Sequence, residues 1–258
     1  MAASHPDVLK LEAEDIQRLD NVLSDGPTPS VTRKALLRRA AAGAAGAATI
    51  GAFGPVSSAL GANASSASVI SDIINAAVTA EALAVTYLTG LIENAKATGV
   101  TAFVDVLKAA NASELDHYKA LRSLGAKPLT TKFWAPDAFF APGAPFKVLE
   151  LAEEQFVNAY LIHITATAKA GMDTAARYGA EILGVEAQHL ALARFAQKKL
   201  PNNVGFQVYK THTIGGIVDN LAKAGIGFGK KGKGPGKFYE FKNPPHRALT
   251  KLASNKPA

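Results

Sequence analysis

The chain of 258 residues contains no cysteine, and only 7% of its residues are aromatic. Without cysteine there are no disulfides and no thiolate ligands, so any metal must be bound by histidine and carboxylate. The missing disulfides do not fix the cellular compartment. No phosphate-binding glycine loop and no Ser-His-Asp arrangement is evident in the sequence. Apolar residues make up 48% of the chain, and the abundant alanine favours packed helices over sheet.

Positive charge is concentrated at the C-terminal end. The whole chain carries a formal charge of +7, but residues after 200 hold ten Lys or Arg against two acids. Residues 65–200 hold twelve bases and thirteen acids, which is close to neutral. The basic character therefore belongs to a C-terminal extension, residues 201–258. Such charge runs are usually solvated tails, and nucleic acid is not an expected partner.

Residues 1–64 are predicted to be an export signal region. Basic residues 32–39 precede a charge-free run, 40–60, and Ala-Asn-Ala at 62–64 offers a cleavage site for a signal peptidase. The basic stretch resembles a twin-arginine signal in which Lys34 replaces the second arginine. We expect a periplasmic or extracellular protein without a stable membrane span after cleavage. The alternative is a retained membrane anchor at 40–60.

The remainder is predicted to be an all-α fold with an irregular extension at its C-terminus. Apolar residues recur with a period of about 3.6 in four segments, each bounded by glycine or proline. These predicted helices cover 71–97, 101–125, 146–171 and 173–199. Residues 127–145 hold prolines and aromatics without helical periodicity. Two helical hairpins joined by one long crossover constitute a ferritin-like four-helix bundle, here predicted for residues 65–200.

Two Glu-x-x-His motifs stand on apolar helix faces. Glu114 and His117 lie in the second predicted helix, and Glu186 and His189 lie in the fourth. Residues three apart share one helical face, so each glutamate and its histidine can reach the same point. A single motif of this kind is usually a solvated pair. Two of them in equivalent helices are typical of a shared site.

The first and third helices each place a glutamate toward the core. Glu81 lies in the apolar stripe of the first helix. In the third helix, Glu153 follows the apolar stripe, whereas Glu154 projects to a more polar side. We therefore choose Glu153, although Glu154 stands six residues before Tyr160, as Glu81 stands six before Tyr87.

Several carboxylates in an apolar core require compensation, because an unpaired buried ion costs several kcal/mol. Two divalent cations would neutralise them. An order of Glu, Glu-x-x-His, Glu, Glu-x-x-His along four helices is typical of di-iron and di-manganese carboxylate proteins. The sequence therefore predicts a site for two iron or manganese ions. Its predicted ligands are Glu81, Glu114, His117, Glu153, Glu186 and His189.

Residues 69–200 resemble the ferritin-like superfamily, in particular bacterial ferritin-like domain proteins related to plant desiccation-related proteins. The resemblance lies in Glu-Leu-Asp-His-Tyr-Lys-Ala-Leu at 114–121, Ala-Tyr at 159–160 and Gly-Val-Glu-Ala-Gln-His at 184–189. It implies the same six metal ligands, with Tyr160 hydrogen-bonded to a ligand carboxylate. It gives Tyr87, one residue short of the equivalent face, no clear role.

These features predict an exported di-metal protein that handles iron, O2 or peroxide in stress protection, with metal ions and O2 or peroxide as partners. If an enzyme, it would be a ferroxidase-like or manganese-catalase-like oxidoreductase. We expect a homo-oligomer, with a dimer as first choice. The alternative is a metal-free structural or protective bundle whose carboxylates are protonated or paired with the histidines. His163 is expected to be a packed or surface histidine and not a ligand.

Overall fold

The computed structural model describes residues 66–242 and 252–257 and is mostly helical. The predicted export signal and the alternative anchor at 40–60 lie outside the described residues. Four long helices correspond to the four predicted ones. They are α4 (Ser66–Glu93), α6 (Val104–Ser123), α7 (Pro145–Lys169) and α8 (Asp173–Ala196). The short helices α5 (Ala95–Thr98) and η2 (Thr101–Phe103) connect α4 to α6.

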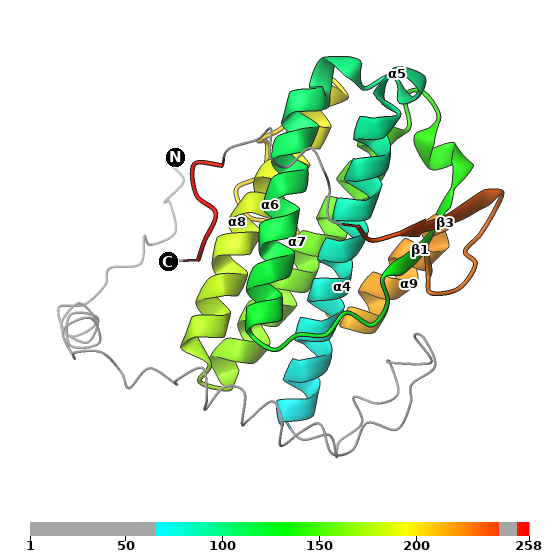
Figure 1. The fold of residues 1–258 in the computed structure, drawn as a ribbon. Helices are drawn as coiled ribbons and strands as arrows, with labels where there is room; N and C mark the ends of the chain where they lie inside the picture. The colour runs from blue at the N-terminus through cyan, green and yellow to red at the C-terminus, as the bar shows by residue number, and fades with distance from the viewer. Residues whose placement is uncertain (1–65, 243–251, 258) are drawn as a thin grey trace, which may run out of the picture.

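The four long helices pack side by side as two hairpins (Figure 1). Helix α4 packs along α6, and α7 packs along α8, while contacts of α4 with α7 and of α6 with α8 join the hairpins. Gly99 follows α5 in the connection between α4 and α6 and has a φ of 77°, and Gly171 lies in the turn between α7 and α8 with a φ of 65°. Glycine adopts these positive φ angles without steric cost. The apolar stripes of all four helices therefore face one another.

Helix α4 is unusually apolar. Within the described part of the chain, its segment Val69–Glu93 alone is long and apolar enough to cross a bilayer by length and composition. A buried core helix of a globular protein passes the same test. In this structure α4 packs against α6 and α7, and 67% of an apolar 18-residue stretch of that segment is buried.

The all-α prediction is incomplete, because the crossover and the C-terminal extension together form a small sheet. Strand β1 (Lys132–Pro136) lies between β2 (Gly227–Phe228) and β3 (Gly236–Glu240), and both pairings are antiparallel. Phe133 is opposite Phe228 on one side and Tyr239 on the other. A further turn, η3 (Asp137–Phe140), completes the crossover. The sheet lies beside α4, on the side of the molecule where β1, β3 and α9 are labelled (Figure 1).

The extension is therefore ordered in its first part, which corrects the prediction of an irregular, solvated tail. Helix α9 (Ile214–Ala224) is capped at its N-terminus by Thr213, whose hydroxyl accepts a hydrogen bond from the Gly216 amide at 3.1 Å. Ile226 and Phe228 are buried against the helices. At Gly227, a Cβ atom would meet the Lys230 carbonyl oxygen at 2.1 Å, so the tight loop after β2 requires glycine there. Burial of a few apolar side chains outweighs the local charge density.

Two lysines of the extension lie over aromatic rings of the same sheet. The Lys231 ammonium is 5.2 Å from the ring centre of Trp134, and that of Lys237 is 5.2 Å from the ring centre of Tyr239. Cation–π contacts of this kind are worth about 0.5–1 kcal/mol at exposed sites. The combination of lysine and aromatic residues in this segment thus has a role within the fold.

Candidate metal centre

All six predicted ligands lie together in the middle of the four helices. Helix α4 supplies Glu81, α6 supplies Glu114 and His117, α7 supplies Glu153, and α8 supplies Glu186 and His189. We call these six residues the Glu/His cluster. The four carboxylates are between 0% and 3% exposed, and the two imidazole side chains about a tenth exposed.

The cluster consists of two overlapping groups of potential ligands. In each group one ligand atom from every residue lies within 4.8 Å of the others. The first group is Glu81, Glu114, His117 and Glu186, and the second is Glu114, Glu153, Glu186 and His189. Glu114 and Glu186 belong to both groups. The cluster can therefore hold a metal ion, and it offers only oxygen and nitrogen donors.

Both histidines turn Nδ1 toward the carboxylates. His117 Nδ1 lies 3.1 Å from Glu186 Oε1 and 3.6 Å from Glu81 Oε2. His189 Nδ1 lies 2.8 Å from Glu114 Oε1 and 3.9 Å from Glu153 Oε1. The Glu-x-x-His spacing accounts for this arrangement, because residues three apart on a helix project from the same face.

Glu153 and not Glu154 faces the core, as predicted. Glu153 is 3% exposed and belongs to the cluster, whereas Glu154 is exposed on the outer face of α7. Tyr160, two turns further along α7, donates a hydrogen bond from its hydroxyl to Glu81 Oε1. The expected contact between Tyr160 and a cluster carboxylate is therefore present. Tyr87 lies elsewhere and donates to the Phe139 carbonyl at 2.8 Å.

His163 is a packed histidine and lies outside the cluster. It is fully buried, and its Nε2 lies 3.0 Å from the Ala175 carbonyl oxygen. Burial lowers the pKa of His163, so the ring is neutral at physiological pH. Its ring packs against α8 at Gly179, where an added Cβ atom would lie 2.9 Å from the imidazole Cδ2.

Without a metal, the cluster holds protons. Burial, together with the negative charges of Glu114 and Glu186, raises the pKa of Glu81 well above its usual value, and burial with the same two charges raises the pKa of Glu153. Burial also opposes ionisation of Glu114, but His189 and neighbouring hydrogen bonds outweigh it and hold the pKa of Glu114 well below its usual value. The core thus favours neutral Glu81 and Glu153 beside an ionised Glu114.

The two imidazoles of the cluster also have raised pKa values, although burial by itself would lower them. Burial lowers the pKa of His189, but the charge of Glu114 and the close approach of the Glu114 and Glu186 carboxylates outweigh burial and raise that pKa to about 9. The neighbouring carboxylates of Glu114, Glu186 and Glu81 likewise outweigh burial at His117 and raise its pKa well above 6.5. Both rings therefore carry protons that a metal ion would have to displace.

Ser113 is a functional candidate that sequence reasoning did not identify. Its hydroxyl donates to the Ala110 carbonyl at 2.9 Å and lies 3.1 Å from His189 Nε2. The hydroxyl is thus free to accept the Nε2 proton, which leaves Nδ1 of His189 directed at Glu114. The signal was absent from the sequence, because the contact joins residues 76 positions apart.

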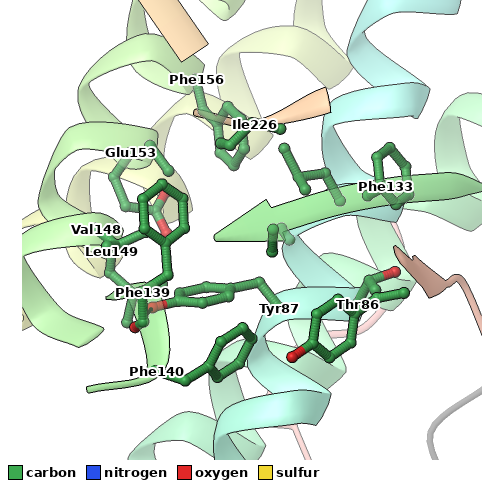
Figure 2. A pocket seen from close by; sticks show the side chains of 15 residues that line it. Thr86, Tyr87, Phe133, Phe139, Phe140, Val148, Leu149, Glu153, Phe156 and Ile226 are labelled. Carbon is green, nitrogen blue, oxygen red and sulfur yellow. Dashed lines mark hydrogen bonds between the residues drawn. The ribbon is translucent and has the colours of Figure 1, made fainter. Parts of the chain in front are cut away.

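Pockets of different polarity adjoin the two ends of the cluster. A pocket of about 390 Å³ at His117, the polar pocket, is lined on one side by Asp116 and Glu181 and on the other by residues 252–257 at the C-terminus. An apolar pocket of about 30 Å³ lies between α4, α7 and β1. Glu153 is at its rim beside Leu149 and Phe156 (Figure 2). A third pocket, also apolar, meets Glu153 and His189.

Comparison of the chain with protein-family models, with characterised proteins and with solved structures found no match in any of the three.

Proposed function

We propose that the Glu/His cluster binds two divalent metal ions, iron or manganese, inside a ferritin-like four-helix bundle. The observation that carries this proposal is the pair of overlapping ligand groups, each with one histidine of its own and with Glu114 and Glu186 in common. Such sharing suits two ions side by side, because a carboxylate has two oxygens and can bind one ion with each. Glu81 and His117 would complete one half, and Glu153 and His189 the other.

The buried polar atoms of the cluster fit this proposal. Among the described residues, six cluster atoms are buried without a hydrogen-bond partner: Glu81 Oε2, Glu114 Oε1, Glu153 Oε2, both Glu186 oxygens and His189 Nδ1. Glu114 Oε1 and His189 Nδ1 are only 2.8 Å apart but are not aligned for a hydrogen bond. Unsatisfied buried polar atoms are rare in proteins and call for an explanation such as an ion.

The donor set favours iron or manganese, because oxygen-rich coordination with one imidazole per ion suits these metals. When bound, two such ions would supply electrons for reaction with O2 or peroxide. The role of the chain is to fix the ligands and keep the site dry. Tyr160 holds Glu81 in place and Ser113 orients His189. Glu114 and Glu186 are fully buried, so they are shielded from water.

We further propose that this chemistry is a form of metal handling or peroxide removal outside the cytoplasm, in stress protection. The support for export is the sequence of residues 1–64, with its basic stretch, charge-free run and small-residue cleavage site. We also propose that the protein forms a homo-oligomer. If the protein is an enzyme, it is an oxidoreductase.

The alternative is a metal-free bundle with a structural or protective role. The distances of 3.1 Å between His117 Nδ1 and Glu186 Oε1 and of 2.8 Å between His189 Nδ1 and Glu114 Oε1 favour it, because protonated imidazoles would balance two carboxylates. The raised pKa values of Glu81 and Glu153 would neutralise the other two. A measurement of the metal content of the protein distinguishes the two functions.

The test is to measure metal by mass spectrometry in the full chain, expressed with iron or manganese supplied. We expect about two equivalents, as in di-metal carboxylate bundles. Glu81→Gln and Glu153→Gln should each lose the ion of one half, whereas Glu114→Gln should weaken both. Glu154→Gln is the matched control, since it makes the same change one residue away on the outer face. A folded parent protein without metal, or equal loss in the Glu154 variant, would refute the proposal.

A further inference from the structure

The two ends of the Glu/His cluster along the bundle axis differ in how they are filled. At one end Tyr160, seven residues after Glu153, occupies the axis and donates its hydroxyl hydrogen to Glu81. The equivalent position on α4, seven residues after Glu81, is Leu88, which has no hydroxyl. Tyr87 is displaced by one residue and turns away to the Phe139 carbonyl. Tyr160 thus donates a hydrogen bond to Glu81, but no tyrosine of α4 does the same for Glu153.

The end without a tyrosine is hollow. A pocket of about 110 Å³, the axial pocket, lies there and reaches Glu153 and His189. Each of the four helices lines it with the residue seven positions from its cluster glutamate, two helical turns along the axis. These residues are Leu88, Leu107, Phe146 and Ala193. Apart from Glu153 and His189, all of the described residues that line the axial pocket are apolar.

Glu153 lines the axial pocket and has one oxygen atom, Oε2, without a hydrogen-bond partner among the described residues. Its side chain is buried. The pocket also reaches the surface between α6 and α8, where its lining residues Val106, Leu192 and Phe195 are 40%, 44% and 62% exposed. A route of apolar side chains thus leads from solvent to one half of the cluster.

The opposite half faces a different environment. His117 opens onto the polar pocket, where Asp116, Glu181, Ser254, Asn255 and Lys256 provide charged and hydrogen-bonding groups. A cation or a peroxide molecule, which must keep polar partners while it loses water, is suited to that side. An apolar molecule is suited to the side of the axial pocket, because it gives up no hydrogen bonds on entry.

We propose that the axial pocket binds dioxygen and delivers it to the half of the cluster formed by Glu153 and His189. The proposal rests on the di-metal function proposed above, because O2 is the oxidant of that chemistry. Dioxygen is apolar and small enough for the space. An engineered apolar cavity of about 150 Å³ stays dry and takes up xenon or benzene, so an apolar pocket of 110 Å³ is large enough for a diatomic gas.

Xenon is the probe for the pocket itself, because it is apolar, similar in size to O2 and visible in crystals and by xenon NMR. It should bind beside Leu88, Leu149 and Ala193 in the full chain with or without metal. Leu88→Phe and Ala193→Leu, two independent fillings of the pocket, should each abolish that binding. Ala180→Leu, on the exposed face of α8, should retain it. Failure of xenon to bind the parent protein would overturn the proposal, whatever the metal content.

The second measurement addresses delivery. In the Fe(II)-loaded protein, filling the pocket should raise the apparent KM for O2 several-fold, while oxidation by hydrogen peroxide keeps its rate constant. Circular dichroism and metal stoichiometry of each variant confirm that helices and centre persist. If the reactions with O2 and peroxide fall in the same proportion in both variants, the pocket is not the O2 route. If the parent binds xenon but no metal, the proposed function fails and the pocket remains as an apolar binding site.

Discussion

The Ser113 hydroxyl lies 3.1 Å from Nε2 of His189, on the side of the ring opposite the cluster. Partners of this kind fix the tautomer and orientation of a metal-binding imidazole, and their loss typically lowers metal affinity 10–100-fold. Because His189 belongs to only one of the two ligand groups, the effect of Ser113 should be confined to one half of the site.

If the cluster binds two ions as proposed, we expect Ser113→Ala to lower the affinity for one of the two metal equivalents by about 10- to 100-fold. The other equivalent, which depends on Glu81 and His117, should bind as in the parent protein. Stepwise metal titration followed by calorimetry measures both. Ser123→Ala is the control, since its exposed hydroxyl also donates to a carbonyl of α6 but is remote from the cluster. Equal weakening of both equivalents would contradict the assignment.

Metal binding should release protons. The metal-free protein favours protons on three cluster groups, because the pKa of His189 is raised to about 9 and the pKa values of Glu81 and Glu153 are raised by burial and neighbouring charge. A metal ion displaces them. The apparent affinity should therefore rise as the pH increases from 6 toward 9. Calorimetry in two buffers of different ionisation enthalpy should detect at least about one released proton; pH-independent binding would argue against the cluster as the site.

The same shift predicts the pH dependence of the metal-free fold. A histidine whose pKa is higher in the folded state stabilises that state fully below its unfolded pKa of 6.5, and the stabilisation is lost as the pH rises through about 9. Metal-free protein should therefore lose stability between pH 6.5 and 9, by up to a few kcal/mol. Urea unfolding across this range measures the loss. His189→Gln should flatten the profile, and an unchanged slope would show that His189 is not protonated.

Tyr160→Phe should destabilise the metal-free protein by about 1–3 kcal/mol, the cost of leaving a buried acceptor unsatisfied. The hydroxyl of Tyr160 donates to Glu81, and both side chains are almost fully buried. Urea denaturation reports the free energy of unfolding. Tyr209→Phe provides the comparison, because that ring is 39% exposed and should tolerate the change within about 0.5 kcal/mol. Similar losses in the two variants would show that the bond to Glu81 contributes little.

The C-terminal sheet should contribute to the stability of the helices. Phe228 on β2 is 4% exposed and packs edge-on against Phe133 of β1, with ring centres 6.1 Å apart. Phe228→Ala should cost about 3–5 kcal/mol, as for other buried phenylalanines. Phe206→Ala, at a residue 93% exposed in the same extension, should cost almost nothing. Thermal unfolding of the two variants gives the comparison, and equal melting temperatures would mean that β2 is not part of the core.

The positions of the six cluster residues could be predicted from the sequence because they depend on local geometry. The apolar stripe of a helix specifies which residues face inward, and Glu153 lies in that stripe while Glu154 does not. The same periodicity placed the four long helices within a few residues of their observed bounds. The need for a counter-charge at the cluster follows from residue type alone, because several ionised carboxylates in an apolar core are costly without one.

The sheet could not be predicted in this way. Phe133 and Phe228 come from distant segments, and β2 is too short to show the alternation by which a strand is recognised. Lysine and glycine around β2 and β3 are typical of solvated loops, so composition favoured a tail. Only the apolar surface left open between α4, α7 and β1 gives Ile226 and Phe228 a place to be buried.

The sequence by itself determined the helices, the inward direction of four glutamates and two histidines, and the pairing of each Glu-x-x-His. These are properties of one helix at a time and follow from its 3.6-residue period. Tertiary structure alone decided that Ser113 meets His189, that Tyr160 reaches Glu81 but Tyr87 turns to Phe139, and that an apolar pocket adjoins Glu153. Those contacts join separate helices, and the distance between two helices depends on how all of their side chains pack.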